Sequence, residues 1–240
     1  MKTLDLNTFF KTIDYDYNKD LKKMGHILSL TKTRDKPNLA LTSSDTFYPT
    51  YGMEQPFFIK AVAEHLKATT FFEIGTGRGT ASYAVSLIPG ISHITTVDIV
   101  PFERKARTAI NYRPAVVSNK DIFKMVQLPE KDKIDFKHVS DYPMIKALSS
   151  GVYDLCFIDG CHEKSNVILE DFKTCLHLVK EGGYIIWDDY DPRRFKVKEV
   201  VDYIVKEYGY QCELIEFRGH LFGSQSPEKD AGEVLMKITK

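Results

Sequence analysis

The sequence lacks the marks of several protein classes. Lys and Arg together number 33, and so do Asp and Glu, so no basic excess indicates a nucleic-acid partner. No apolar run approaches the ~18 residues that cross a membrane. Residues 1–20 also lack the apolar core of a signal peptide. We therefore expect a cytoplasmic protein with neither a nucleic-acid nor a membrane partner.

Cysteine is scarce as well. The four cysteines form no C-x-x-C pair, and Cys156 and Cys175 fall in a predicted buried strand and on a predicted helix. This pattern is typical of reduced cysteines that serve as small apolar side chains. A zinc site at Cys161 and His162 is disfavoured because the usual spacing of zinc ligands is absent.

Glycine, by contrast, is concentrated in one stretch, residues 71–80, which read FFEIGTGRGT. The pattern predicts a short buried strand, a tight turn and the start of a helix. Its three glycines let the backbone turn sharply and approach a ligand closely, and such a turn offers free backbone N–H groups. A dinucleotide-binding turn has the spacing G-x-G-x-x-G. Thr80 stands where the third glycine would fall, which disfavours a nicotinamide cofactor.

Strand patterns alternate with helix patterns after residue 54, which predicts an α/β fold with a doubly wound, mostly parallel sheet. The chain length favours one large domain over residues 54–240, preceded by an N-terminal helical extension over residues 1–53. The last two strands have no helix between them, which predicts an antiparallel edge strand. The expected helices cover residues 54–67, 80–88, 165–179 and 197–208, and the seven expected strands cover residues 71–74, 93–98, 134–139, 153–159, 184–187, 212–217 and 233–238.

Two segments are less regular. Residues 105–133 are charged, and we expect helices on both sides of Arg113-Pro114. Residues 1–50 mix charged and aromatic side chains. They form either helices packed on the sheet, or on another subunit of a homo-oligomer, or a lid with Tyr48, Tyr51 and Gly52 near the mouth of the site. The first interpretation is favoured because aromatic residues are more often buried in a core than used in contacts.

Acidic residues stand where several of the predicted strands end. Ligands of open α/β sheets bind at the carboxyl ends of the strands. Asp98 ends the strand that follows the glycine turn, a position where an acid accepts hydrogen bonds from the ribose hydroxyls of a nucleoside. Ser140 and Asp141 follow the next strand, and they are candidates to hold the edge of the base.

Three further aspartates, Asp159, Asp188 and Asp189, follow two other strands of the predicted sheet. Converging carboxylates repel one another and bind protons unless a cation joins them. Oxygen-only ligands suit Mg²⁺ or a similar divalent ion. The alternative is that these residues face water or cap helices, as Asp191 before Pro192 is placed to do. The metal interpretation is favoured.

Two segments resemble the class I S-adenosylmethionine-dependent methyltransferases. Glu73 stands two places before Gly75, as in the first motif of that family, G-x-G-x-G preceded by an acid. Residues 154–191 resemble the branch of metal-dependent O-methyltransferases that act on catechols and on sugar hydroxyls of macrolides. N-methyltransferases of nucleic acids and of protein glutamine usually carry an Asn/Asp-Pro-Pro-aromatic tetrad where this chain reads DGCH at residues 159–162, which disfavours that chemistry.

The resemblance implies transfer of a methyl group from S-adenosylmethionine to a hydroxyl of a small molecule, with a divalent metal such as Mg²⁺. The implied cofactor-binding residues are Glu73, Gly75, Thr76, Gly77, Gly79, Asp98, Ser140, Asp141 and Asp159. The implied metal ligands are Asp159, Asp188 and Asp189.

His162 is the implied general base, three residues after Asp159. Catechol-type enzymes carry a Lys at this offset, whereas the macrolide sugar enzymes resemble this chain in having a His. A sugar hydroxyl is a weak acid, and a neutral imidazole can take its proton near neutral pH. The alternative role is a structural hydrogen bond to the loop or to a carboxylate. Two other functions stay open: a nicotinamide-dependent oxidoreductase, and a protein that binds S-adenosylmethionine without turnover.

Overall fold

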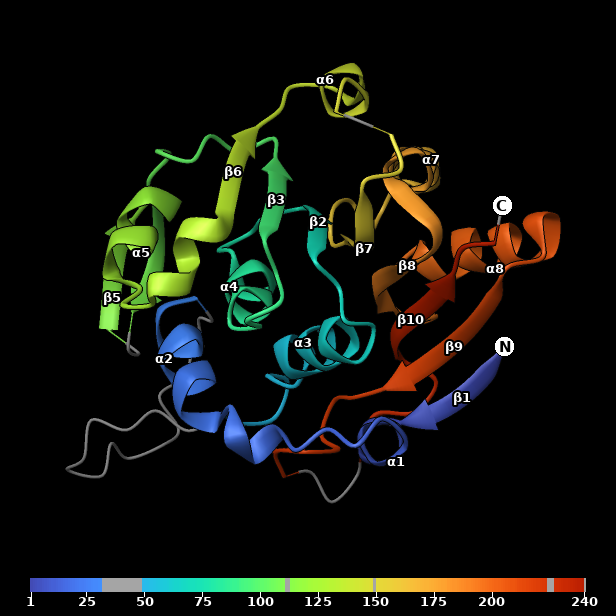
Figure 1. The fold of residues 1–240 in the computed structure, drawn as a ribbon, viewed down its shortest axis with the longest axis horizontal. Coiled ribbons are helices and arrows are strands. Elements are labelled where there is room, and N and C mark those ends of the chain that lie inside the picture. Colours follow the sequence, from blue (N-terminus) through green and yellow to red (C-terminus); the bar gives the residue numbers. More distant parts are fainter. Residues whose placement is uncertain (32–48, 111–112, 149, 224–226, 240) are drawn as a thin grey trace.

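The computed structural model describes residues 1–31, 49–110, 113–148, 150–223 and 227–239. A twisted sheet runs through the middle of the molecule, with helices on both of its faces (Figure 1). Its eight strands, in spatial order, are β1 (Lys2–Asp5), β9 (Gln211–Glu216), β10 (Gly232–Lys237), β8 (Val179–Tyr190), β7 (Tyr153–Ile158), β2 (Thr70–Ile74), β3 (His93–Asp98) and β6 (Ile134–His138).

The strand directions confirm the predicted fold class. β10 pairs antiparallel with both β8 and β9, and every other pairing in the sheet is parallel. The predicted number of seven strands is wrong, because β1 of the N-terminal extension pairs in parallel with β9 and makes an eighth. β1 has only four residues, KTLD, and no side chain in it is buried. A strand that short carries no readable alternation of polar and apolar residues.

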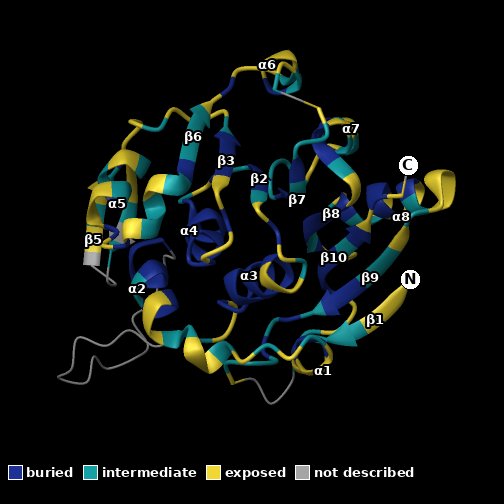
Figure 2. Cartoon of the chain, in the orientation of Figure 1, coloured by how far each residue is buried: buried dark blue, intermediate teal, exposed yellow. Residues whose placement is uncertain are grey.

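Helices cover the two faces of the sheet in separate layers. Alternate residues of one strand serve different layers: Phe71 of β2 packs with the helices of one face and Phe72 with those of the other. In Figure 2 much of the central strands and the inner sides of these helices are buried, whereas β1 at the edge is not. The helices are α1 (Leu6–Thr12), α2 (Leu21–Thr31), α3 (Gln55–His65), α4 (Thr80–Ser86), α5 (Asn119–Met125), α6 (Tyr142–Lys146), α7 (Ser165–Leu178) and α8 (Val197–Tyr208), with short 3₁₀ turns η1 (Tyr17–Lys19) and η2 (Pro129–Lys133).

Of the helices expected on both sides of Arg113-Pro114, the one on the C-terminal side forms, as α5 from Asn119, and the one on the N-terminal side does not. The pair itself lies in an antiparallel hairpin of β4 (Ala106–Ile110) and β5 (Arg113–Val117). Pro114 disfavours helical dihedral angles in the residue before it. A two-stranded hairpin also tolerates proline, because a strand with a free side need not use every N–H.

The N-terminal extension packs on the sheet. Phe9 and Phe10 of α1 and Met24 of α2 are buried in the same apolar cluster as Phe57 of α3. This matches the interpretation favoured from the sequence for the described part of the extension. Tyr48 lies outside the described residues, so its expected place at the mouth of the site is not addressed.

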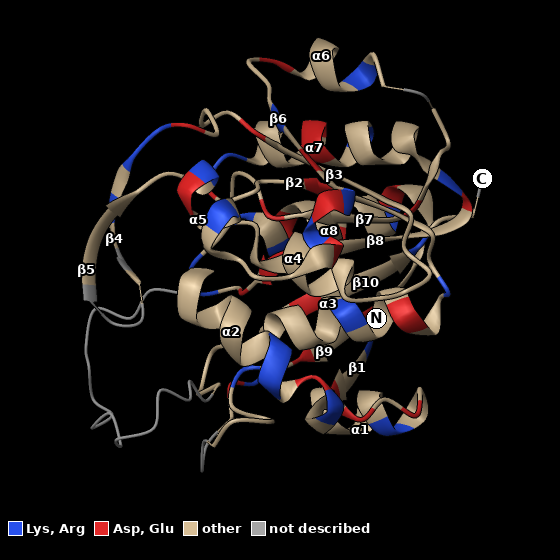
Figure 3. Cartoon of the chain, turned by 60° about the vertical axis from the view of Figure 1, so that its left-hand side comes forward, with Lys and Arg blue, Asp and Glu red and all other residues tan. Residues whose placement is uncertain are grey.

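Charged side chains of both signs are interspersed along the chain (Figure 3). None of the helices in the described ranges is long and apolar enough to cross a membrane.

Candidate active site

The glycine turn brings two strand ends into contact. Gly75 has a φ of +90°, and a Cβ added there would lie 1.9 Å from the backbone oxygen of Asp159. Only glycine can occupy this position, because a side chain would collide with the backbone at the end of β7. The turn therefore lies against the end of β7, where Asp159 is the first of the acidic residues of the site.

A cavity of about 500 Å³ opens at the carboxyl ends of β2, β3, β6 and β7. Asp98 lies in its wall, and its carboxylate accepts hydrogen bonds from the backbone N–H groups of Gly77 at 3.1 Å and Val100 at 2.8 Å. Six residues predicted to bind the cofactor line this cavity: Gly75, Gly77, Asp98, Ser140, Asp141 and Asp159. Apolar side chains, among them Ile99 and Ile145, form much of the remaining wall.

The Asp141 side chain also has a local role. Its carboxylate accepts a hydrogen bond from the backbone N–H of Met144 at 3.1 Å and so caps the start of α6. Asp141 thus fixes the short helix that stands beside the cavity, while its residue still lines the cavity wall.

A second cavity of about 220 Å³ shares Gly77 and Asp159 with the first. Glu73 lies in its wall, is 2% exposed and accepts a hydrogen bond from the Ser82 hydroxyl at 2.6 Å. Thr76 also lines it. The predicted cofactor residue Gly79 lines neither cavity and is instead the N-cap residue of α4.

The residues in the wall of this second cavity that the sequence interpretation missed include three polar ones. They are Thr31 at the end of α2, Gln55 at the start of α3 and Arg78 inside the glycine turn. Only Arg78 carries a signal in the sequence, as a cation within the turn itself. Thr31 and Gln55 come to the site only because α2 and α3 pack beside it.

The structure groups acidic side chains near Asp159, but the group differs from the three predicted metal ligands. We call Asp159, His162 and Asp188 the acidic cluster. One ligand atom from each of Asp159, His162 and Asp188 lies within 4.8 Å of the others. Asp189, the third predicted ligand, has a φ of +54° and forms an ion pair with Arg218 at 2.9 Å. The described structure therefore groups two of the three aspartates with the histidine, and it gives the third a cationic partner.

Burial and mutual contacts shift the pKa values of the side chains in and beside this cluster. Burial raises the pKa of Asp159, and contacts with His162 and Asp188 oppose that effect. Burial and the charge of Asp188 raise the pKa of Asp189, against the charges of His162 and Arg218. For His162, burial lowers the pKa, but the bond to Asp159 and the charges of Asp189 and Asp159 outweigh it and raise the value to about 9.

His162 lies between two carboxylates. Its Nε2 is 3.4 Å from Asp159 Oδ1, and its Nδ1 is 3.7 Å from Asp189 Oδ2. The ring also lies 5.4 Å from that of Phe195, between centroids. The predicted base is thus within reach of the acidic cluster, and its ring is held from more than one side.

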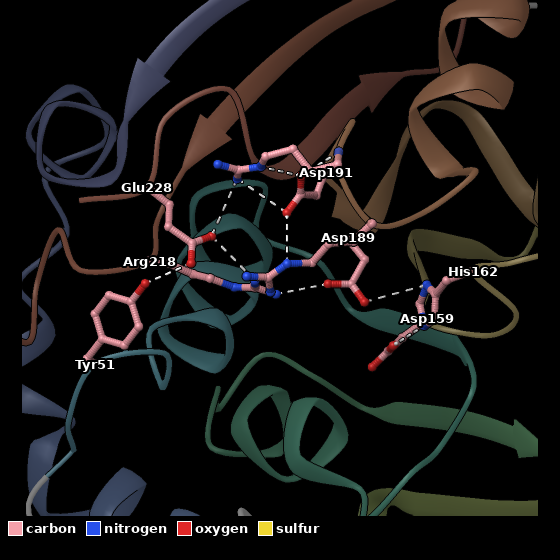
Figure 4. A network of polar contacts seen from close by, with 9 residues as sticks. Tyr51, Asp159, His162, Asp189, Asp191, Arg218 and Glu228 are labelled. Atoms are coloured by element: carbon pink, nitrogen blue, oxygen red, sulfur yellow. Dashed lines mark hydrogen bonds and ion pairs between the residues drawn. The ribbon is translucent and has the colours of Figure 1, made fainter. Parts of the chain in front are cut away.

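A chain of polar contacts leads from this histidine to the N-terminal part of the protein (Figure 4). Arg218, which binds Asp189, lies 3.5 Å from Glu228, and Glu228 accepts a hydrogen bond from the Tyr51 hydroxyl at 2.7 Å. Tyr51 before α3, Asp189 near the end of β8, and Arg218 and Glu228 between β9 and β10 therefore meet beside the acidic cluster.

Comparison with known proteins agrees with this geometry. Residues 72–190 match the family model described as a methyltransferase domain. This part of the chain is a methyltransferase domain. The resemblance seen in the sequence to class I S-adenosylmethionine-dependent methyltransferases is thereby confirmed, and the span of the match includes the glycine turn, Asp98 and the acidic cluster.

Solved structures that resemble this methyltransferase share its fold over almost the whole chain. Cofactor-bound Rv0187 from MTB is 14% identical with a TM-score of 0.60, over 98% of this chain and 96% of that one. The O-methyltransferase TomG from Streptomyces achromogenes, in complex with SAM, is 15% identical with a TM-score of 0.56 over the same shares. An O-methyltransferase from Bacillus cereus, in complex with SAH, is 14% identical with a TM-score of 0.55, over 98% of this chain and 97% of that one.

One curated relative matches at the level of sequence. It is an uncharacterized protein of Acanthamoeba polyphaga mimivirus, 38% identical over 68 residues, which is 28% of this chain and 30% of that protein. The match therefore spans less than a third of that protein.

Proposed function

We propose that this methyltransferase transfers the methyl group of S-adenosylmethionine to a hydroxyl of a small molecule, with the help of a divalent metal. The observation that carries the proposal is the position of the acidic cluster. Asp159 belongs both to the cluster and to the walls of the two cavities that meet at the glycine turn. A cofactor in those cavities would reach the groups that can bind a metal and take a proton. O-methyltransferases are also among the proteins that share this fold.

The cofactor half of the site rests on residues in the larger cavity. Asp98 has a carboxylate there that can accept hydrogen bonds from ribose hydroxyls. Each of its oxygens already accepts one backbone N–H, and a carboxylate oxygen has capacity for a second donor. Ser140 and Asp141 stand where they can contact the edge of the base, and the apolar walls suit its faces.

The metal would be held by Asp159 and Asp188. Both are carboxylates, which suit Mg²⁺ and Mn²⁺, and partial burial raises the pKa of the Asp159 carboxyl because it disfavours the charged form. Asp189 is the weaker ligand of the three predicted, because Arg218 already neutralises it. A bound divalent cation lowers the pKa of the acceptor hydroxyl and helps to fix its orientation.

His162 is proposed as the general base. Its pKa of about 9 means that it carries a proton near neutral pH in the absence of a cation, and a base must be neutral. The carboxylates that raise this pKa include the proposed metal ligands. Positive charge bound there would offset their effect and favour the neutral imidazole, which can then take the hydroxyl proton. The competing role for His162 is that of a nitrogen ligand beside Asp159 and Asp188.

The test is a methyl-transfer screen over catechols, sugars and polyketide glycosides, with mass detection of the product. Each reaction is run with Mg²⁺, with Mn²⁺ and with EDTA. We expect one acceptor class to gain a single methyl group, with turnover abolished by EDTA and restored by the metal. Turnover that EDTA leaves unchanged would contradict the metal assignment.

The two competing functions are separated by binding measurements on the same protein. Calorimetric titration should detect S-adenosylmethionine and not NADH. Binding of NADH alone would favour an oxidoreductase. Binding of S-adenosylmethionine with no product from any acceptor would favour a protein that holds the cofactor without turnover.

A further inference from the structure

We propose that Arg78 binds the α-carboxylate of the methionyl group of S-adenosylmethionine in the smaller cavity, and so decides which way round the cofactor lies. The inference rests on the proposed function, because it takes S-adenosylmethionine as the ligand. It adds an anchoring residue for the methionyl end, to which the sequence analysis assigned no residue.

The first support is the distribution of charge around the two cavities. Among the described residues that line them, Arg78 is the one with a basic side chain. The acids in the same walls are Glu73, Asp98, Asp141, Asp159 and Asp171. These acids would repel a ligand carboxylate, so Arg78 is the charged side chain in the two walls that can attract it.

The second support is the state of the Arg78 side chain. Its Nη1 atom is buried and has no hydrogen-bond partner among the described residues. No ion pair of Arg78 with a described acid is formed either, whereas Arg193 and Arg218 both pair with carboxylates. Leaving a buried donor of a charged group unmatched costs free energy. A ligand carboxylate would satisfy it, because a guanidinium matches a carboxylate with two parallel hydrogen bonds.

The third support is the fit of the whole cofactor. Its methionyl end carries an ammonium and a carboxylate, and the smaller cavity offers an acid, Glu73, and a cation, Arg78. The adenosyl end carries no charge, and the larger cavity has mainly apolar walls with Asp98 among them. The reverse orientation would bring the carboxylate beside Asp98 and Asp141. Arg78 therefore orients the cofactor by charge.

The experiment compares three ligands on the full-length protein by calorimetry. They are S-adenosylmethionine, its decarboxylated form S-adenosylmethioninamine, and methylthioadenosine, which lacks the whole amino-acid group. The variants are Arg78→Met, which keeps an apolar side chain of similar length, and Arg78→Lys, which keeps the charge. Arg107→Met is the matched control, because Arg107 is exposed on β4 and lines neither cavity.

We expect Arg78→Met to weaken S-adenosylmethionine binding about ten- to a hundredfold, the range for a lost charge-assisted pair. Its affinity for the decarboxylated form and for methylthioadenosine should stay within about twofold, which also shows that the variant is folded. Arg78→Lys should recover part of the loss, and Arg107→Met should match the wild type.

Two results would overturn the proposal while leaving the proposed function intact. One is wild-type affinity for S-adenosylmethionine in Arg78→Met. The other is an equal loss for the decarboxylated form, which would show that the carboxylate is not the partner. If the wild-type protein binds none of the three ligands, the proposed function fails, and this inference fails with it.

Discussion

Two aspartates at opposite ends of β7 differ sharply in their surroundings. Asp154 lies near the amino end of the strand and accepts hydrogen bonds from the backbone N–H groups of Thr69 at 2.8 Å and Thr70 at 3.0 Å. Lys180 adds an ion pair at 2.7 Å. Asp159 follows the carboxyl end of the same strand, and its cationic neighbour is His162, at 3.4 Å.

The pKa values of the two carboxyls follow these surroundings. Burial tends to raise the pKa of Asp154, but the bonds from Lys180, Thr69 and Thr70 outweigh it and hold the pKa well below its usual range. Burial raises the pKa of Asp159, and its contacts do not overcome that effect. Asp154 is thus a structural acid that ties β7 to the start of β2. Asp159 retains unused capacity to bind a cation or a ligand.

Asp159→Asn should have the largest effect on activity. Because it removes a proposed metal ligand and the partner of His162 together, we expect methyl transfer to fall by about 10⁴-fold or more. The measurement is kcat/KM at saturating metal. Asp154→Asn is the matched control on the same strand, and it should keep activity within a few-fold. Comparable losses in both variants would remove the functional distinction between the two ends of β7.

The thermal stability of Asp159→Asn also distinguishes Asp159 from Asp154. A carboxyl with a raised pKa stabilises the folded state only while it is protonated, so its contribution is lost as the pH rises above the unfolded value. In EDTA at neutral pH we therefore expect Asp159→Asn to melt at the same temperature as the wild type or higher. A clearly lower melting temperature would show that Asp159, like Asp154, is held by structural bonds.

His162→Gln should come next in size. A general base contributes typically ~10²–10⁴-fold, so kcat should fall by that order while the affinities for cofactor and metal stay near wild type. If metal affinity falls as well, His162 is a ligand of the cation. Turnover within a few-fold of wild type across the pH range would leave the histidine with a structural role.

Asp98→Ala should have a smaller effect, confined to cofactor binding. Loss of charge-assisted hydrogen bonds to ribose hydroxyls costs about 1.5–3 kcal/mol. S-adenosylmethionine and methylthioadenosine should weaken together, because both contain the ribose. Calorimetry that shows wild-type affinity for both ligands would refute this assignment.

Asp154→Asn should have the smallest effect, and on stability alone. We expect the free energy of unfolding to fall by about 1–3 kcal/mol at neutral pH, because charged acceptors of backbone N–H groups are lost. The pKa of Asp154 is lowered from 3.8, so its contribution is complete above that value and is lost as the pH falls through the lower, folded-state pKa. Thermal melts should therefore show a gap between variant and wild type that narrows below about pH 4. A constant gap would mean that charge is not its source.

Part of this architecture could be predicted because it depends on local sequence. The glycine turn is one such part: residues 75, 77 and 79 all have positive φ values, which glycine adopts at low cost. Asp98 and Asp159 were placed at the carboxyl ends of strands by pattern alone, and both line the larger cavity. By contrast, the hairpin at Arg113-Pro114 was misread, because short strands lack a clear period.

Other features depend on residues that are far apart in the chain. Asp188 and Asp189 are neighbours in sequence, and nothing in the pattern separates them. The fold places Asp188 with Asp159, and it turns Asp189, at a φ of +54°, toward Arg218 from the segment after β9. The role proposed for Arg78 depends in the same way on the fold, which places it in the cavity wall and leaves its buried Nη1 without a described partner.

The sequence by itself determined the alternation of strands and helices, the tight turn and the acids at strand ends, because each follows from the conformational preferences of a few consecutive residues. The tertiary structure alone decided which acids are balanced by partners and which are not. Asp154 and Asp159 are the same residue type at the ends of one strand, and their difference comes from Thr69, Lys180 and His162, which the fold brings to them. Whether a carboxylate has a compensating partner depends on residues that are close in space, so it can be determined only once the fold is known.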